Sequence, residues 1–363
     1  MPRELLPTLE RFIATEELLQ PGDRVAVAVS GGSDSVGLLL LLQGLVPRWG
    51  LQLTVVHFDH QLRPESAQEA EFVRQLAVRR GLECHIGKED VQERMRQKRQ
   101  NLEEAARHAR YSFFARICSG MGIHRLATGH TADDQAETVL FHLLRGSGPA
   151  GLAGMRPSSP LSAAHGGSVE PDIHLVRPLV WARRQTLREF LEGVGQQWIE
   201  DPSNAVPNRS RTRIRHQLLP LLSREFNPAI VERLCATAEI LRGEEDAWNE
   251  AVEAAMQTLP REPLPGGGYC LRLDSLRKMP MGLRRRVLRA LVETVQDGLR
   301  RVDFDHIQQL LQWIGERPPA SSAAGRGMRR MEFAGVRVEV TTRELRLRPR
   351  QPVPANQTPV STV

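Results

Sequence analysis

A buried apolar run that ends in a glycine turn constrains the fold of this 363-residue chain more than any other feature. Residues 25–29 read Val-Ala-Val-Ala-Val, a composition typical of a parallel strand buried on both faces. Gly31 and Gly32 follow, and residues 36–42 are apolar enough for a core helix. Glycines let a ligand approach the backbone, and a helix N-terminus favours anions. The sequence therefore predicts an anion-binding turn.

The chemistry of this turn differs from that of a Walker loop, because no lysine follows the glycines at the Walker spacing. Ser30, Ser33 and Ser35 offer hydroxyl groups, and Asp34 offers a carboxylate. A carboxylate beside phosphates indicates a divalent cation between them. The pattern S-G-G-x-D-S resembles the pyrophosphate loop of the N-type ATP pyrophosphatases, which transfer AMP to a carbonyl and release pyrophosphate. An ordinary strand–turn–helix connection is the alternative interpretation.

Strands and helices alternate over residues 1 to about 145. Strand-like stretches cover residues 51–58, 83–87 and 124–129, and helical patterns cover about 65–80, 102–118 and 132–144. This alternation predicts an α/β fold with a doubly wound, mostly parallel, Rossmann-like sheet. Ligands bind at the carboxyl ends of such strands, so we expect residues 30–35, 57–63 and 129–134 to meet there.

Three parts of the chain differ in pattern. Residues 1–220 are expected to form an ATP-pyrophosphatase catalytic domain that contains a long loop at 146–173. Residues 221–350 are expected to form a mainly helical domain. Alternating stretches at 335–340 and 344–348 predict a β-hairpin at the end of this domain. Residues 351–363 are rich in Pro, Gln, Thr and Ser, a composition typical of disorder.

Composition narrows the class of protein. The 49 Lys and Arg exceed the 43 Asp and Glu, giving a net charge of +6 that favours an RNA partner. No apolar run is long enough to span a membrane and no signal peptide is evident, so we expect a cytoplasmic protein. The four cysteines are scattered, which argues against a local zinc or iron–sulfur site.

A second polar cluster follows the strand at 124–129. It contains His130, Asp134 and Glu137, and a helix at 132–144 would place both carboxylates on one face. Paired acids at a strand edge suit a metal or a cationic substrate. Arg145 then supplies a cation before a glycine-containing segment. The simpler interpretation, helix capping, accounts for one acid at most.

A third cluster carries four arginines within residues 209–215, among them Arg211, Arg213 and Arg215. Such a run is often a solvated helix face. Here it follows the turn-like stretch Asp201-Pro202-Ser203-Asn204. That context favours a phosphate-binding or RNA-binding role.

Together with residues 57–63, these clusters resemble the tRNA(Ile)-lysidine synthetases, over about residues 23–220 most clearly. The resemblance implies ligation of free L-lysine to the wobble cytidine of an isoleucine tRNA with a CAU anticodon, through an adenylated cytidine. It implies ATP and Mg²⁺ as cofactors, and a homodimer is compatible with it. The implied ATP-binding residues are Ser30, Gly31, Gly32, Ser33, Asp34, Ser35 and His57, with Asp34 also at the metal. The implied catalytic residues are Asp34, His130, Asp134, Glu137 and Arg145. Asp134 and Glu137 would bind lysine, and Arg63, Arg211, Arg213 and Arg215 would contact tRNA or phosphate. The resemblance also implies that the helical domain at 221–350 binds tRNA.

Three other functions stay open. A tRNA thiolase of the same superfamily is the main alternative, although such enzymes generally need paired or catalytic cysteines. A small-molecule synthetase that uses ammonia would need an ammonia source. A non-enzymatic RNA-binding protein would not need the full set of polar residues, from Asp34 to Glu137, that the chain retains.

Overall fold

The computed structural model describes residues 4–61, 66–91, 102–162, 172–200, 210–295, 302–316 and 328–350. The chain divides into two compact units, Met1–Gly243 and Glu244–Val363. The division falls within the helix α12 (Ile230–Thr258). In the described residues, no helix is long and apolar enough to cross a membrane.

A six-stranded sheet forms the centre of the first unit. Its strands are β1 (Arg24–Ala28), β2 (Gln52–Asp59), β3 (Glu83–Lys88), β4 (Arg125–Thr128), β5 (Ser158–Pro160) and β6 (His174–Val176). They lie in the order β3-β2-β1-β4-β6-β5, and every neighbouring pair is parallel except β5 with β6. The predicted doubly wound, mostly parallel fold is confirmed.

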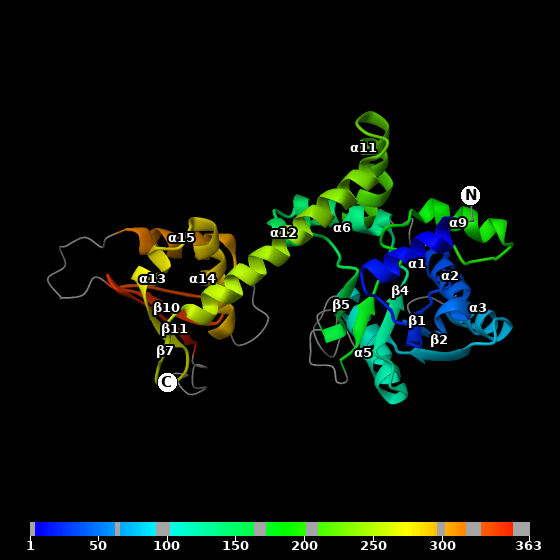
Figure 1. Ribbon diagram of the computed structural model, residues 1–363, viewed down its shortest axis with the longest axis horizontal. Coiled ribbons are helices and arrows are strands. Elements are labelled where there is room, and N and C mark those ends of the chain that lie inside the picture. Colours follow the sequence, from blue (N-terminus) through cyan, green and yellow to red (C-terminus); the bar gives the residue numbers. More distant parts are fainter. Residues whose placement is uncertain are drawn as a thin grey trace, which may run out of the picture. The chain divides into compact units, whose positions relative to one another are not determined.

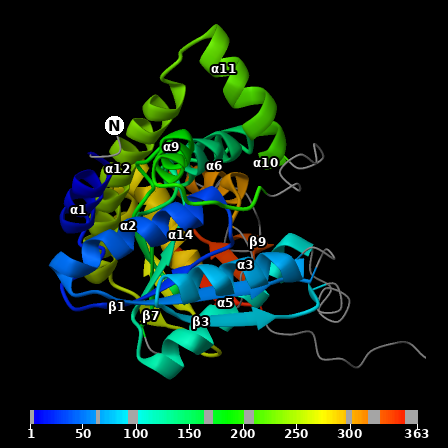
Figure 2. The same ribbon diagram turned by 90° about the vertical axis from the view of Figure 1, so that its right-hand side faces the viewer.

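The helices of this unit connect and cover the strands. They are α1 (Leu5–Thr15), α2 (Ser33–Trp49), α3 (Ser66–Arg79), α5 (Leu102–Met121), α6 (Ala132–Leu144), α7 (Pro149–Leu152), α9 (Arg184–Gly193), α10 (Ser210–Arg213) and α11 (Leu219–Glu225). A π-helical turn, Ile214–Leu218, joins α10 to α11. The helices α6 and α10 lie next to each other (Figure 2).

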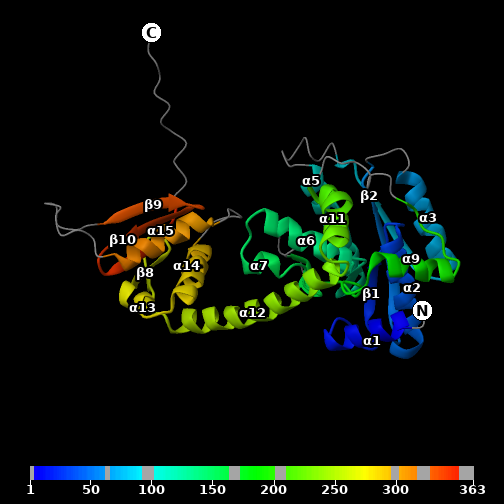
Figure 3. The ribbon, with the colours of Figure 1, turned by 90° about the horizontal axis from the view of Figure 1, so that it is seen from above.

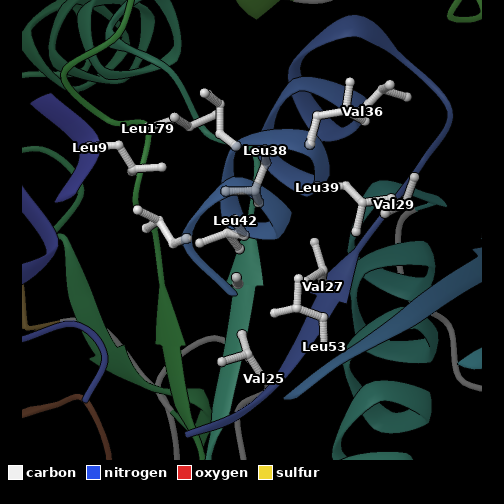
Figure 4. Packing of buried hydrophobic residues seen from close by; sticks show 14 of the residues in the cluster. Leu9, Val25, Val27, Val29, Val36, Leu38, Leu39, Leu42, Leu53 and Leu179 are labelled. Carbon is white, nitrogen blue, oxygen red and sulfur yellow. The ribbon is translucent and has the colours of Figure 1, made fainter. Parts of the chain in front are cut away.

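Both faces of the sheet are buried, as the continuous apolar run of β1 predicts. Side chains alternate along a strand. Val25 and Val27 therefore pack on one face with apolar residues of α1, α2, α3 and α9 (Figure 4). Ala26 points to the other face and packs with α5. Figure 3 shows α5 on one side of β2, with α2 and α3 on the other.

The strand order places a ligand crevice at a definite edge. β1 pairs with β2 on one side and with β4 on the other, so the chain reverses its direction of winding between β1 and β4. Ala28 lies opposite both Val56 and Thr128. The turns that follow β1, β2 and β4 therefore leave the sheet at the same edge, which is where open α/β sheets bind ligands.

The second unit combines helices with a sheet (Figure 1). Besides the end of α12, its helices are α13 (Leu273–Arg277), α14 (Met281–Val295) and α15 (Phe304–Gly315). Its strands are β7 (Glu262–Pro263), β8 (Tyr269–Arg272), β9 (Arg329–Phe333), β10 (Val336–Val340) and β11 (Glu344–Pro349), in the order β7-β8-β11-β10-β9. A shared apolar cluster joins α14 and α15 to this sheet. The predicted hairpin is thus β10–β11, extended by three strands that the sequence did not predict.

The stretch 146–173 also differs from the predicted long loop. Among its described residues it contains α7 and the edge strand β5, which is antiparallel to β6. Pro149 occupies the first turn of α7, a position where its missing N–H group costs no hydrogen bond. These elements have three or four residues each and give no periodic signal.

Candidate active site

The turn between β1 and α2 is held in shape by Ser35. Its hydroxyl accepts from the backbone nitrogen of Ser30 at 3.1 Å and donates to the carbonyl of Gly32 at 3.0 Å. Gly31 has a φ of +95°, a conformation that side chains strain to adopt. No side chain caps α2 at Gly32. That helix end therefore offers backbone N–H groups and a positive dipole to an anion.

Gly129, the first residue after β4, brings a second turn against this loop. A Cβ atom at Gly129 would lie 2.8 Å from the carbonyl oxygen of Asp34 and 2.9 Å from the nitrogen of Ser35. Only a residue without a side chain fits so close to backbone atoms. The absence of a Cβ at this position therefore lets the start of α2 and the end of β4 form one continuous site.

Two histidines at this edge are uncharged near neutral pH. The Nδ1–H group of the buried His57 donates to the carbonyl of Val29 at 2.7 Å, and burial lowers its pKa. His130 Nδ1 lies 2.9 Å from the hydroxyl of Thr128, and burial lowers the pKa of His130 to about 4 against the opposing effect of Asp134. The Val29 carbonyl can only accept, so the Nε2 atom of His57 is left as the hydrogen-bond acceptor of its ring.

The helix α6 presents the two predicted carboxylates from its first turns. Thr131 and Asp134 form a capping box: Asp134 accepts from the Thr131 backbone nitrogen at 2.9 Å and from its hydroxyl at 2.8 Å. This arrangement fixes the Asp134 carboxylate and leaves Oδ1 for other partners. Glu137 lies one turn further along, and its side chain is only 6% exposed.

Two arginines neutralise these carboxylates. Arg184 donates from Nε to Asp34 Oδ2 and from Nη2 to Asp134 Oδ1, both at 2.8 Å. Arg215 donates to both oxygens of Glu137, at 2.6 and 3.0 Å, and to Asp134 Oδ1 at 3.1 Å. One network of ion pairs therefore connects Asp34, in the loop between β1 and α2, with Asp134 and Glu137 on α6.

Burial and ion pairing shift the pKa values of the acids in different directions. Burial raises the pKa of Asp34 and of Glu137 above their usual values, although the arginines oppose it. Burial also acts to raise the pKa of Asp134, but Arg184 and His130 outweigh it and hold the pKa below its usual value. Asp134 is therefore the carboxylate best suited to stay charged.

Sequence reasoning did not identify Arg184. Its helix, α9, begins with Arg184 and is preceded by Arg183 at the N-cap position. A cation is unfavourable at a helix N-terminus, so two arginines there were a signal that they pair with anions. Asp133 supplies one such anion, because it accepts from the backbone nitrogen of Arg184 at 2.8 Å and pairs with Arg183.

The structure groups most of the predicted site residues. Ser30 to Ser35, His57, His130, Asp134, Glu137 and Arg215 lie at the carboxyl edge of β1, β2 and β4 or bind groups there. Arg63 lies outside the described residues. Within the described part of the chain, no group of three or more His, Cys, Asp and Glu is arranged to hold a metal ion.

Three predicted arginines lie apart from this group. Arg145 is the exposed C-cap of α6, about 16 Å along the helix axis from Asp134. Its guanidinium lies 4.0 Å from the ring centroid of Phe141, and that of Arg211 lies 5.3 Å from the same centroid. Arg211 and Arg213 are exposed on α10. Arg145, Arg211 and Phe141 therefore form a basic and aromatic cluster.

Comparisons with known proteins identify related sequences. The model of a PP-loop domain matches residues 5–222, and the model of a TilS substrate binding domain matches residues 271–339. A tRNA(Ile)-lysidine synthase of Solibacter usitatus is 40% identical over 90% of this chain and 67% of its own length. The corresponding protein of Thermosynechococcus vestitus is 33% identical over 88% of both chains. This chain spans 62 to 67% of the length of the first three relatives.

A solved structure shares the fold. The U34-tRNA thiolase NcsA of Methanococcus maripaludis, with its [4Fe-4S] cluster, superposes with a TM-score of 0.53 at 16% identity. The match covers 66% of this chain and 80% of the thiolase. At that identity the likeness concerns the fold and carries no argument for thiolation.

Proposed function

Since the chain belongs to the tRNA(Ile)-lysidine synthases, a family of PP-loop enzymes, we propose that it ligates L-lysine to the wobble cytidine of a CAU-anticodon isoleucine tRNA. One observation carries the proposal. The guanidinium of Arg184 joins the carboxylates of Asp134 and Glu137 to Asp34, which belongs to the anion-binding loop Ser30–Ser35. The site thus combines a place for nucleotide phosphates with an anionic place for an amine.

The reaction has two steps. In the first, the 2-carbonyl oxygen of cytidine attacks the α-phosphorus of ATP, the bond to pyrophosphate breaks, and an adenylated cytidine forms. The N–H groups at the start of α2 and the hydroxyls of Ser30 and Ser33 would hold the pyrophosphate part of the nucleotide. In the second, the ε-amine of lysine attacks the activated carbon, AMP leaves, and the amine releases a proton.

The carboxylates would bind and orient lysine. Asp134 keeps its charge and so suits an ammonium group, whereas Glu137 has a raised pKa and suits the role of proton acceptor. The neutral ring of His130 lies beside the capped end of α6, and its low pKa keeps it from repelling the ammonium group. The acceptor role of Glu137 requires that Arg215 leave it when lysine binds.

The residues fit Mg²⁺. Asp34 offers a hard carboxylate oxygen at the mouth of the phosphate cradle, and the hydroxyl of Ser33 lies 3.2 Å from that carboxylate. Magnesium sites next to nucleotides commonly take one or two carboxylates and complete their shell with phosphate and water. Bound at Asp34, Mg²⁺ would neutralise phosphate charge.

The variant Asp134→Asn tests the assignment of the lysine site. Asparagine retains an oxygen that accepts the two capping bonds from Thr131, so the start of α6 should stay intact. We expect lysine incorporation into tRNA to fall by about two orders of magnitude, while tRNA-dependent pyrophosphate release persists in part. Glu189→Gln, which changes an exposed acid on α9, is the matched control. Equal loss of both steps would contradict the assignment.

A further inference from the structure

Arg184 occupies a central position between the two halves of the site. Its Nε atom binds Asp34 of the nucleotide loop and its Nη2 atom binds Asp134 of the amine site, each at 2.8 Å. Its Nη1 atom lies 3.8 Å from Glu137. The side chains of Arg184, Asp34 and Asp134 are each 20% exposed. A single guanidinium thus joins residues 150 and 50 positions away in the sequence.

The backbone of Arg184 is anchored independently of these contacts. Its nitrogen donates to Asp133 at 2.8 Å. One turn further, Leu187 is fully buried, and its Cβ would lie 3.6 Å from a Cβ placed on Gly37 of α2. Because α9 packs closely on α2 in this way, the guanidinium can change partners by side-chain rotation while its helix stays in place.

The proposed ligands compete with Arg184 for its partners. The ammonium group of lysine needs Asp134, and the cation that accompanies the nucleotide needs Asp34. Both carboxylates form ion pairs with Arg184 in the structure. The nucleotide, however, brings phosphates to the loop beside Asp34, and a guanidinium binds phosphate in a bidentate manner. The nucleotide thereby offers Arg184 a new partner and removes an old one.

We propose that Arg184 is a positioning residue that exchanges partners when nucleotide binds, and so makes the lysine site more accessible once ATP is bound. Before binding, it bridges Asp34 and Asp134 and covers the amine site. After binding, it pairs with phosphate and Asp34 pairs with the divalent cation. Asp134 Oδ1 then keeps Arg215 as its remaining ion-pair partner and can accept the ammonium group in the place that Arg184 leaves. This inference rests on the proposed function and adds an order of binding to it.

The test measures lysine affinity by isothermal titration calorimetry, with and without a non-hydrolysable ATP analogue and Mg²⁺. In the wild-type protein we expect the analogue to tighten lysine binding by about tenfold, within the usual range of coupling between sites. In Arg184→Gln we expect lysine to bind about tenfold more tightly than in the wild type when the analogue is absent, because one of the two arginines that compete for Asp134 is gone. The analogue should then change the affinity of this variant by less than about twofold.

Two further variants sharpen the test. Arg188 lies on the same helix and pairs with the exposed Glu200. Arg188→Gln should therefore keep the wild-type effect of the analogue on lysine affinity. Arg184→Lys keeps the charge, but one ammonium group cannot span both carboxylates, so it should also lose most of the coupling. It serves as the substitute if Arg184→Gln does not fold.

The outcomes separate the inference from the proposed function. If the analogue does not tighten lysine binding to the wild type, or if Arg184→Gln only weakens it, the partner exchange is wrong. If Arg184 had a merely structural role, Arg184→Gln would only weaken lysine binding. If lysine does not bind the wild type under either condition, while the analogue does bind, the assignment of lysine to this site fails instead.

Discussion

Gly129→Ala should push the nucleotide loop away from β4. The new Cβ atom would lie 2.8 Å from the oxygen and 2.9 Å from the carbon of Asp34, and 2.9 Å from the nitrogen of Ser35. Ordinary van der Waals contact begins at 3.4 Å, and all three atoms belong to the backbone, which cannot rotate aside. The loop or the strand end must therefore move by about 0.6 Å.

The magnitude follows from that displacement. Overpacking of this kind costs about 1–3 kcal/mol of unfolding free energy. For a unit of this size we expect the melting temperature to fall by roughly 5 °C. A displacement of this size lengthens the hydrogen bonds that the loop can donate to phosphate. The loss of about one such bond should weaken binding of an ATP analogue by about tenfold.

Thermal unfolding followed by circular dichroism and calorimetric titration of the analogue provide the assay. Gly120→Ala is the control, since no atom lies within 4 Å of a Cβ there and Gly120 is inside α5. Alanine at that position should keep the wild-type affinity and slightly raise the melting temperature. Wild-type stability and affinity in Gly129→Ala would refute the close-approach argument.

Three further predictions follow from charge. Burial lowers the pKa of His60 to about 4, below the 6.5 of an unfolded histidine, so the unfolding free energy should fall as the pH drops from about 6.5 towards 4. Chemical denaturation across that range should show a shallower fall for His60→Asn, and a gain in stability on acidification would contradict this. The buried Glu245 pairs with Arg286 at 2.9 Å, so Arg286→Ala should lower the unfolding free energy by about 3 kcal/mol. Arg289→Ala breaks an exposed pair and should leave the unfolding free energy nearly unchanged. Equal denaturation midpoints for the two variants would disprove this difference. If the exposed Arg213 contacts an RNA phosphate, Arg213→Gln should lower the slope of log tRNA affinity against log salt by about 0.7, measured by filter binding. An unchanged slope would contradict that contact.

Much of the first unit was predictable because its signals are local. The apolar run of β1 and the Thr131 cap of α6 each fix an element through neighbouring residues, and α6 begins and ends where the pattern predicts. The strands β5 and β7 were not predicted, since elements of three and two residues carry no periodicity and owe their pairing to distant partners.

The candidate site, too, was predictable from the sequence only in part. The motifs indicated which acids and hydroxyls matter, and sheet geometry indicated that they meet at one edge. The sequence contained no information on which cation pairs with which acid, because Arg184 lies 150 residues from Asp34 and reaches it only in the folded chain. The placement of Arg211 against Phe141 likewise depends on the packing of α10 on α6, whereas Arg145 lies only four residues from Phe141 along α6 itself. The predicted catalytic role of Arg145 stays a prediction.

The central claim is that the chain joins lysine to the wobble cytidine of tRNA. The most direct measurement incubates the purified protein with ATP, Mg²⁺, labelled lysine and an unmodified CAU-anticodon isoleucine tRNA transcript. We expect acid-stable label in the tRNA, which disappears when the wobble cytidine is replaced by uridine. Pyrophosphate release without any incorporation of lysine would contradict the claim and would direct the search to another nucleophile.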